Sequence, residues 1–158
     1  MWGVMITSYL LMAISFFSLI FTAYGGYFHS IENHILVSLF SSITYMLCQT
    51  LILFYFIVSG SKIKQLIKLN SLDVKKYYKP VLDMKMTLFP HIMFNMLIMG
   101  ATFIIGGGVH TETISKDTHS LCFFASITHY LFVIFFQHRC FIKNTELVIL
   151  VSDLVNDN

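Results

Sequence analysis

Charged residues are scarce in this chain of 158 residues. Asp, Glu, Lys and Arg make up 11% of the sequence, against roughly 25% in soluble domains. Hydrophobic residues make up 56%, and the mean hydropathy is +0.75. This scarcity excludes a water-soluble fold. Together with a net charge of only +2, it also excludes a disordered chain and a nucleic-acid-binding module. The composition therefore predicts an integral membrane protein.

The motifs of common catalytic and cofactor sites are also missing. The sequence has no glycine-rich phosphate loop, nucleophile elbow, HExxH, CxxC or CxxCH. Its three cysteines, Cys48, Cys122 and Cys140, lie in or at the end of apolar segments and are expected to be small packing residues. The Gly106-Gly107-Gly108 run is interpreted as the end of a helix. These absences favour a non-catalytic protein over an enzyme.

What the sequence does contain is four long windows without any charge. They run over Met1–Ile31, Asn33–Ser61, Met86–Thr111 and Thr118–His138. Each has at least the ~20 residues that a helix needs to cross a ~30 Å hydrocarbon layer. We therefore expect one membrane domain over residues 1–158, an all-α bundle of four transmembrane helices. The expected spans are residues 4–25, 34–59, 87–107 and 119–142.

The basic residues predict the orientation of the bundle. Nine of the ten Lys and Arg residues lie in the segment 60–86 or after His138, and only Lys116 lies elsewhere. Because basic loops resist translocation, both termini, the segment 60–86 and a short tail over 143–158 are expected on the cytoplasmic or matrix side. The membrane would be a bacterial cytoplasmic membrane or an organelle inner membrane.

The segment 60–86 is the one strongly basic region. Apolar residues recur at helical spacing over residues 61–69, which is typical either of a helix lying in the headgroup region or of an extension of the second span. Asn70 and Ser71 are expected to break it, with Ser71 capping a further short helix, Pro80 marking a bend and Pro90 the start of the third span. Each lysine near an anionic surface contributes about 1 kcal/mol. We therefore expect contact with anionic lipids or a partner subunit through Lys62, Lys64, Lys68, Lys75, Lys76 and Lys79.

Polar residues within the spans form one stripe on each helix, so the stripes are expected to meet inside the bundle. The helical rise places Tyr45, Asn95 and His129 near the bilayer centre. They are interpreted as an interhelical hydrogen-bond cluster, with a proton path or a quinone pocket as alternatives. An inner layer is expected to contain Gln49, His91, Gln137 and His138. No charged residue is expected to be buried in a span, which disfavours an ion-coupled pump.

Histidines gather at the outer ends of the predicted spans. A b-type haem needs two imidazoles at matched depth on facing helices, and His34 with His119 meets this condition better than His91 with His138. The outer residues also include Glu32 and Glu112, so a divalent metal site is an alternative. A third interpretation is that these are hydrated residues at helix ends. The outer histidines are His29, His34, His110 and His119.

The expected function follows from the short loops and the missing catalytic motifs. The chain is predicted to be a structural or accessory component of a larger membrane protein complex, with other membrane subunits as partners. One alternative is a membrane-anchor cytochrome that binds haem b or quinone and transfers electrons. Another is a small oligomeric transporter or channel.

Overall fold

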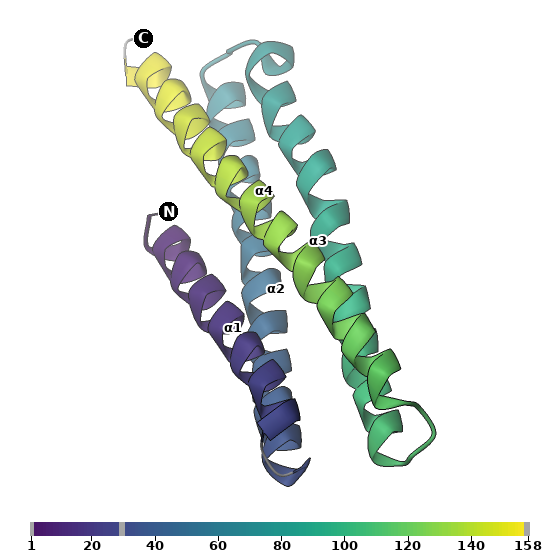
Figure 1. The fold of residues 1–158 in the computed structure, drawn as a ribbon. Coiled ribbons are helices and arrows are strands. Elements are labelled where there is room, and N and C mark those ends of the chain that lie inside the picture. The colour runs from purple at the N-terminus through teal and green to yellow at the C-terminus, as the bar shows by residue number, and fades with distance from the viewer. Residues whose placement is uncertain (1, 29–30, 157–158) are drawn as a thin grey trace.

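The protein consists of four long helices joined by short turns. The computed structural model describes residues 2–28 and 31–156. Its helices are α1 (Trp2–Phe28), α2 (Ile31–Leu69), α3 (Val74–His110) and α4 (Lys116–Asn156). The α1–α2 and α3–α4 turns lie at one end of the bundle, and the turn between α2 and α3 lies at the other (Figure 1). The predicted all-helical class is confirmed, and each helix is long and apolar enough to cross a membrane.

Every helix is longer than the span predicted for it. α2 runs without a break through Lys68, so this part of the basic segment extends the second span and is not a separate helix. α4 continues as helix to Asn156, where a tail was expected. Pro90 lies inside α3 and does not start it, because Val74 is already helical. A proline removes one backbone hydrogen bond from a helix, and the packing of α3 against α2 and α4 outweighs that loss here.

The predicted break after α2 is confirmed, but its cap is a different residue. The helix ends at Leu69, and Ser71 has a φ of 55°, which reverses the chain in a short turn. Asp73, and not Ser71, caps α3, because its carboxylate accepts a hydrogen bond of 2.8 Å from the Lys75 backbone N–H.

At the end that carries this turn, three helices pack without α1. α1 begins part-way along the bundle and does not reach the end that carries the α2–α3 turn (Figure 1). Ile63 and Ile67 of α2, Val81 of α3 and Val151 of α4 form a second hydrophobic core there. The six predicted lysines are all exposed around it. This end is therefore a small three-helix extension with a basic surface.

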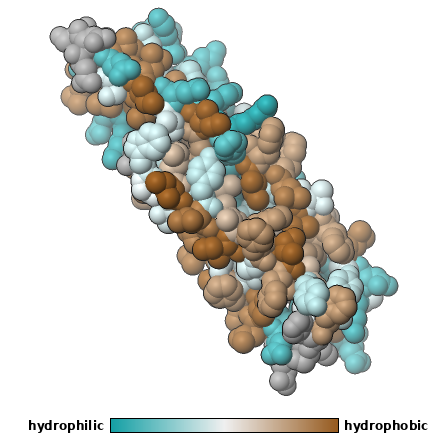
Figure 2. Space-filling view, turned by 60° about the vertical axis from the view of Figure 1, so that its left-hand side comes forward, coloured by the Kyte–Doolittle hydropathy of each residue, from teal (hydrophilic) through white to brown (hydrophobic). Residues whose placement is uncertain are grey.

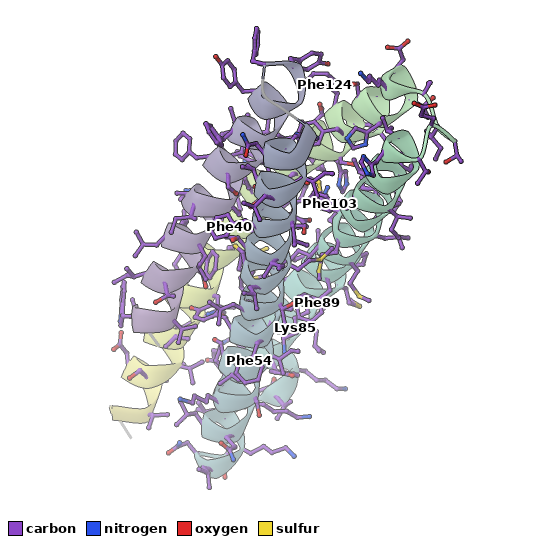
Figure 3. The ribbon with its side chains drawn as sticks, turned by 90° about the horizontal axis from the view of Figure 1, so that it is seen from below. Phe40, Phe54, Lys85, Phe89, Phe103 and Phe124 are labelled. Atoms are coloured by element: carbon purple, nitrogen blue, oxygen red, sulfur yellow. The ribbon has the colours of Figure 1, made fainter. Side chains whose placement is uncertain are left out.

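The middle of the molecule has an apolar surface. Figure 2 shows hydrophobic residues gathered between two hydrophilic ends. Phe40 and Phe54 of α2 and Phe124 of α4, labelled in Figure 3, are each at least half exposed. Some polar residues are fully buried, among them Ser15, Asn95 and Gln137. The bundle is thus apolar outside and partly polar inside, which is the arrangement expected of a protein in lipid.

The two helix hairpins are related by an internal repeat. Five buried residues of α1 match five buried residues of α3 at one constant offset in the numbering. The pairs are Ser8 and Leu88, Met12 and Ile92, Ser15 and Asn95, Leu19 and Met99, and Thr22 and Thr102. The same faces of the two helices are therefore buried, although only one pair is identical.

α2 and α4 repeat one another in the same way. Seven buried residues of α2 match seven of α4, again at one constant offset. The pairs are Ser41 and Ser126, Tyr45 and Tyr130, Cys48 and Val133, Ile52 and Gln137, Tyr55 and Cys140, Phe56 and Phe141, and Ser59 and Asn144. The second hairpin thus repeats the burial pattern of the first.

The contacts between α2 and α4 pair equivalent residues of the two hairpins, but α3 packs closely against α2 whereas α1 barely touches α4, so the two-fold symmetry is confined to α2 and α4. Equivalent residues contact each other, as in an isologous interface. The rings of Tyr45 and Tyr130 are 5.0 Å apart between centroids, and the Ser59 hydroxyl donates a 2.9 Å hydrogen bond to the side-chain oxygen of Asn144. Because α2 and α4 run in the same direction (Figure 1), the axis lies along the bundle, as in parallel-repeat membrane proteins.

One buried polar contact departs from this symmetry. The Gln137 side-chain amide donates a 2.6 Å hydrogen bond to Gln49 Oε1, and both side chains are fully buried. The remaining amide atoms, Gln49 Nε2 and Gln137 Oε1, have no hydrogen-bond partner. The repeat places Ile52 at the position equivalent to Gln137 and Ile134 at that equivalent to Gln49. Isoleucine therefore fits both places in this fold.

We expect the glutamine pair to respond non-additively to substitution. Gln137→Ile alone should lower the free energy of unfolding by about 1–2 kcal/mol, because Gln49 then loses its buried partner. Adding Gln49→Ile should restore most of that loss, since no polar group is left unpaired. Thermal unfolding in detergent measures the three variants. Equal and additive losses from the two single substitutions would contradict this interpretation of the pair.

Candidate functional site

Each hairpin places a histidine directly against a helical glycine of its own first helix. His34 lies near the start of α2, and a Cβ added at Gly26 of α1 would be 3.2 Å from its Cε1 atom. His119 lies in the first turns of α4, and a Cβ added at Gly106 of α3 would be 3.1 Å from its Cε1 atom. A larger residue at either glycine would press on the imidazole, so glycine favours this close approach. The two imidazoles therefore occupy equivalent positions at the end of the bundle that holds the hairpin turns.

A hydrogen-bonded pair of hydroxyls holds each hairpin in register beside the histidine. Thr22 Oγ1 is 2.7 Å from Ser41 Oγ, and Thr102 Oγ1 is 3.0 Å from Ser126 Oγ. In both halves the threonine precedes the glycine by four residues, and the serine follows the histidine by seven. Four polar or small positions are thus repeated at identical spacing, which our sequence reasoning missed. Comparing the two halves of the sequence would have found them.

The two imidazoles belong to the same end of the bundle. His34 lies near the start of α2 and His119 near the start of α4, and these two helix starts are at the end that holds the α1–α2 and α3–α4 turns (Figure 1). The Nδ1 atom of each is buried and has no hydrogen-bond partner. Burying a polar atom without a partner costs free energy. Two imidazoles from different hairpins at one end of the bundle are candidate ligands for one group.

The structure does not assemble a metal site from the other residues predicted at this end. His110 is the last residue of α3 and is exposed, as are Glu112 and Asp117. His29 and the side chain of Glu32 lie outside what the structure describes. Over the described parts of the chain, no three His, Cys, Asp or Glu residues group together so as to hold a metal ion.

Two of the three residues predicted for the central cluster meet. Tyr45 donates a hydrogen bond of 2.5 Å to Asn95 Oδ1, and Asn95 Nδ2 donates one of 3.0 Å to the Ser126 carbonyl. His129 is not part of this cluster, because its neighbour Tyr130 faces the interior and contacts Ser15 Oγ at 2.7 Å. Consecutive helical residues point about 100° apart, so His129 is turned toward the surface.

The predicted inner pair of histidines is also arranged differently. His91 lies beside His129, with 6.0 Å between ring centroids, and not beside His138. His138 Nδ1 instead lies 2.9 Å from the Tyr9 hydroxyl. His91 thus lies close to the central cluster, one helical turn before Asn95 on α3.

The basic residues lie at the opposite end from the paired histidines. Lys64 lies over the Tyr78 ring at 5.4 Å and Lys76 over the Tyr77 ring at 5.2 Å. Such contacts hold the aliphatic stems against the aromatic rings and leave the charges in solvent. The lysines are therefore available to an anionic surface.

No known protein family, characterised protein or solved structure shows significant similarity to this chain.

Proposed function

We propose that the chain is an integral membrane subunit that holds a b-type haem between His34 and His119 and transfers electrons within a larger membrane assembly. The observation that carries this proposal is the symmetric imidazole pair, one from each hairpin, each seated against a helical glycine. A repeat that preserves Thr, Gly, His and Ser at the same spacing in both halves indicates that these positions act together.

Haem is the group that this donor set suits best. Its macrocycle occupies four positions around the iron, and two axial imidazoles complete the coordination. A site with two protein ligands is therefore sufficient for haem, whereas zinc sites normally use three or four. When bound, the haem would supply one-electron transfer. The protein would supply both axial nitrogens, their orientation and the apolar surroundings that exclude water.

The surroundings of the pair support the proposal in two further ways. The two buried Nδ1 atoms without partners mark imidazoles whose hydrogen bonding is incomplete. Gly26 and Gly106 carry no side chain beside the rings, so each imidazole packs directly on helix backbone, which fixes its position.

The membrane setting is part of the same proposal. Four apolar helices and an apolar belt support a chain that crosses the membrane four times. The basic end supports an orientation with both termini on the cytoplasmic or matrix side. In that orientation the haem would lie toward the opposite face, and the exposed lysines of the three-helix extension would contact anionic lipids.

A purely structural subunit is the second candidate. It is favoured by the three-helix extension, which carries a groove of about 680 Å³ between α3 and α4. Charges of both signs line this groove, from Asp83, Arg139, Lys143 and Glu146, so another subunit could dock there. A pore through a single chain is disfavoured, because the buried rings of Tyr45, Tyr130, Phe56 and Phe141 fill the space between α2 and α4.

A difference spectrum tests the proposal. The protein is expressed in a haem-producing host, purified in mild detergent, and measured as dithionite-reduced minus air-oxidised. We expect redox-sensitive haem bands at close to one haem per chain. A folded protein with a featureless spectrum would contradict the haem proposal. If that protein also co-purified with stoichiometric membrane partners, the structural candidate would be preferred.

A further inference from the structure

A second pair of imidazoles lies on the surface of the α3–α4 hairpin. The rings of His91 and His129 are 6.0 Å apart between centroids, and both side chains are partly exposed. The Nδ1 atom of His129 is buried without a hydrogen-bond partner. His129 lies ten residues beyond His119 on α4, or about 15 Å along the helix, so this pair is separate from the first. Ionisable groups at such depth are costly and usually functional.

The internal repeat shows that the fold does not require this pair. The positions equivalent to His91 and His129 in the first hairpin are Leu11 and Thr44. The first hairpin thus forms the same packing with an aliphatic and a hydroxyl side chain. The histidine pair is therefore a feature of the second hairpin alone.

Aromatic rings surround the two imidazoles. Phe136 stacks on His91 with 5.3 Å between centroids and 26° between planes. Phe94 meets His129 edge-on at 5.2 Å. Phe132 lies near both imidazoles, at 5.8 and 6.3 Å, and half of its surface is exposed, as is more than half of Phe94. Together these rings form a flat aromatic patch with imidazole N–H donors on the apolar outer surface of the bundle.

We propose that this patch binds the ring of a lipid-soluble quinone, which reaches it sideways from the bilayer. This inference rests on the proposed function, because it names the redox partner of an electron-carrying subunit. A quinone ring is planar and stacks on aromatic side chains. Its carbonyl oxygens accept hydrogen bonds, which His91 and His129 donate. A membrane-facing site suits a ligand that is dissolved in lipid.

Binding of a short-tailed benzoquinone to the purified protein tests the inference. The test variant is the double substitution His91→Leu and His129→Thr, which copies the first hairpin and should therefore fold. The control is His138→Leu, which removes an imidazole from the same helix outside the patch. We expect at least about tenfold weaker binding in the double variant, and binding by the control that matches the unaltered protein.

The haem spectrum, recorded on the same samples, separates this inference from the proposed function. We expect unchanged haem bands in the double variant, since His34 and His119 are untouched. Haem without quinone binding, or equal binding by the double variant, would overturn the quinone site alone. Quinone binding without haem would overturn the haem proposal alone. If the double variant does not fold, the single substitutions decide in the same way.

Discussion

Replacing His34 with alanine is expected to remove nearly all of the haem absorbance, and replacing His119 is expected to do the same. The reason is that the proposed site would need both imidazoles to hold the haem, and the described histidine His110 at the same end is exposed at the end of α3. Because the two positions are equivalent in the repeat, the two variants should lose haem to a similar extent. Haem content per chain, measured after purification, gives the result.

His110→Ala is the matched control for this experiment. His110 lies at the same end of the bundle but is exposed at the end of α3, so its loss should leave the haem content unchanged. If His110→Ala removed the haem while His34→Ala and His119→Ala kept it, the assignment of the ligands would be wrong. A thermal unfolding curve for each variant shows whether the bundle itself is intact.

In intact cells, a cysteine placed at Gln65 is expected to remain unlabelled by a membrane-impermeant maleimide, while a cysteine placed at Asp117 is expected to be labelled strongly. Gln65 is an exposed residue of α2 among the lysines, and Asp117 is exposed in the first turn of α4. The two lie at opposite ends of the bundle (Figure 1). Since nine of the ten basic residues lie at the Gln65 end, that end should stay inside.

The labelling experiment needs a background in which Cys48, Cys122 and Cys140 are alanine. Permeabilised cells provide the control, because both introduced cysteines should then react. Reversed labelling would overturn the orientation and place the proposed haem at the inner face. Equal labelling of both sites in intact cells would contradict four crossings.

Much of the fold was predictable from local features. The four expected spans, residues 4–25, 34–59, 87–107 and 119–142, each lie inside one helix, because a chain segment that avoids water must satisfy its backbone hydrogen bonds within itself. The break at Asn70 and Ser71 was also predictable from turn-forming side chains. The helix ends were predicted less well. Lys62 to Lys68 and residues 143–156 carry charges that a hydropathy argument places outside a span, and yet they continue the helix because Ile67 and Val151 pack in a second core.

The candidate sites were predictable only in part. His34 and His119 share a depth that the helical rise gives directly, but their glycine contacts needed the structure. The sequence analysis placed His129 in the interior, whereas Tyr130 is the buried residue. The buried face of a helix was inferred from the spacing of polar residues alone, and such an inference is uncertain by one residue. The pairing of His91 with His129 depends on how far α3 is shifted along α4, and no local pattern in the sequence measures such a shift.

Hydropathy, charge and turn residues alone were enough to establish four apolar helices, a basic end and a bundle with a polar interior. These properties depend on each segment's own preference for lipid or water, so they can be read one segment at a time. Only the packed structure could establish three of the contacts: Tyr45 with Asn95, His34 with Gly26, and His91 with His129. Each depends on the rotation and the axial shift of one helix against another, which the summed packing of many side chains sets.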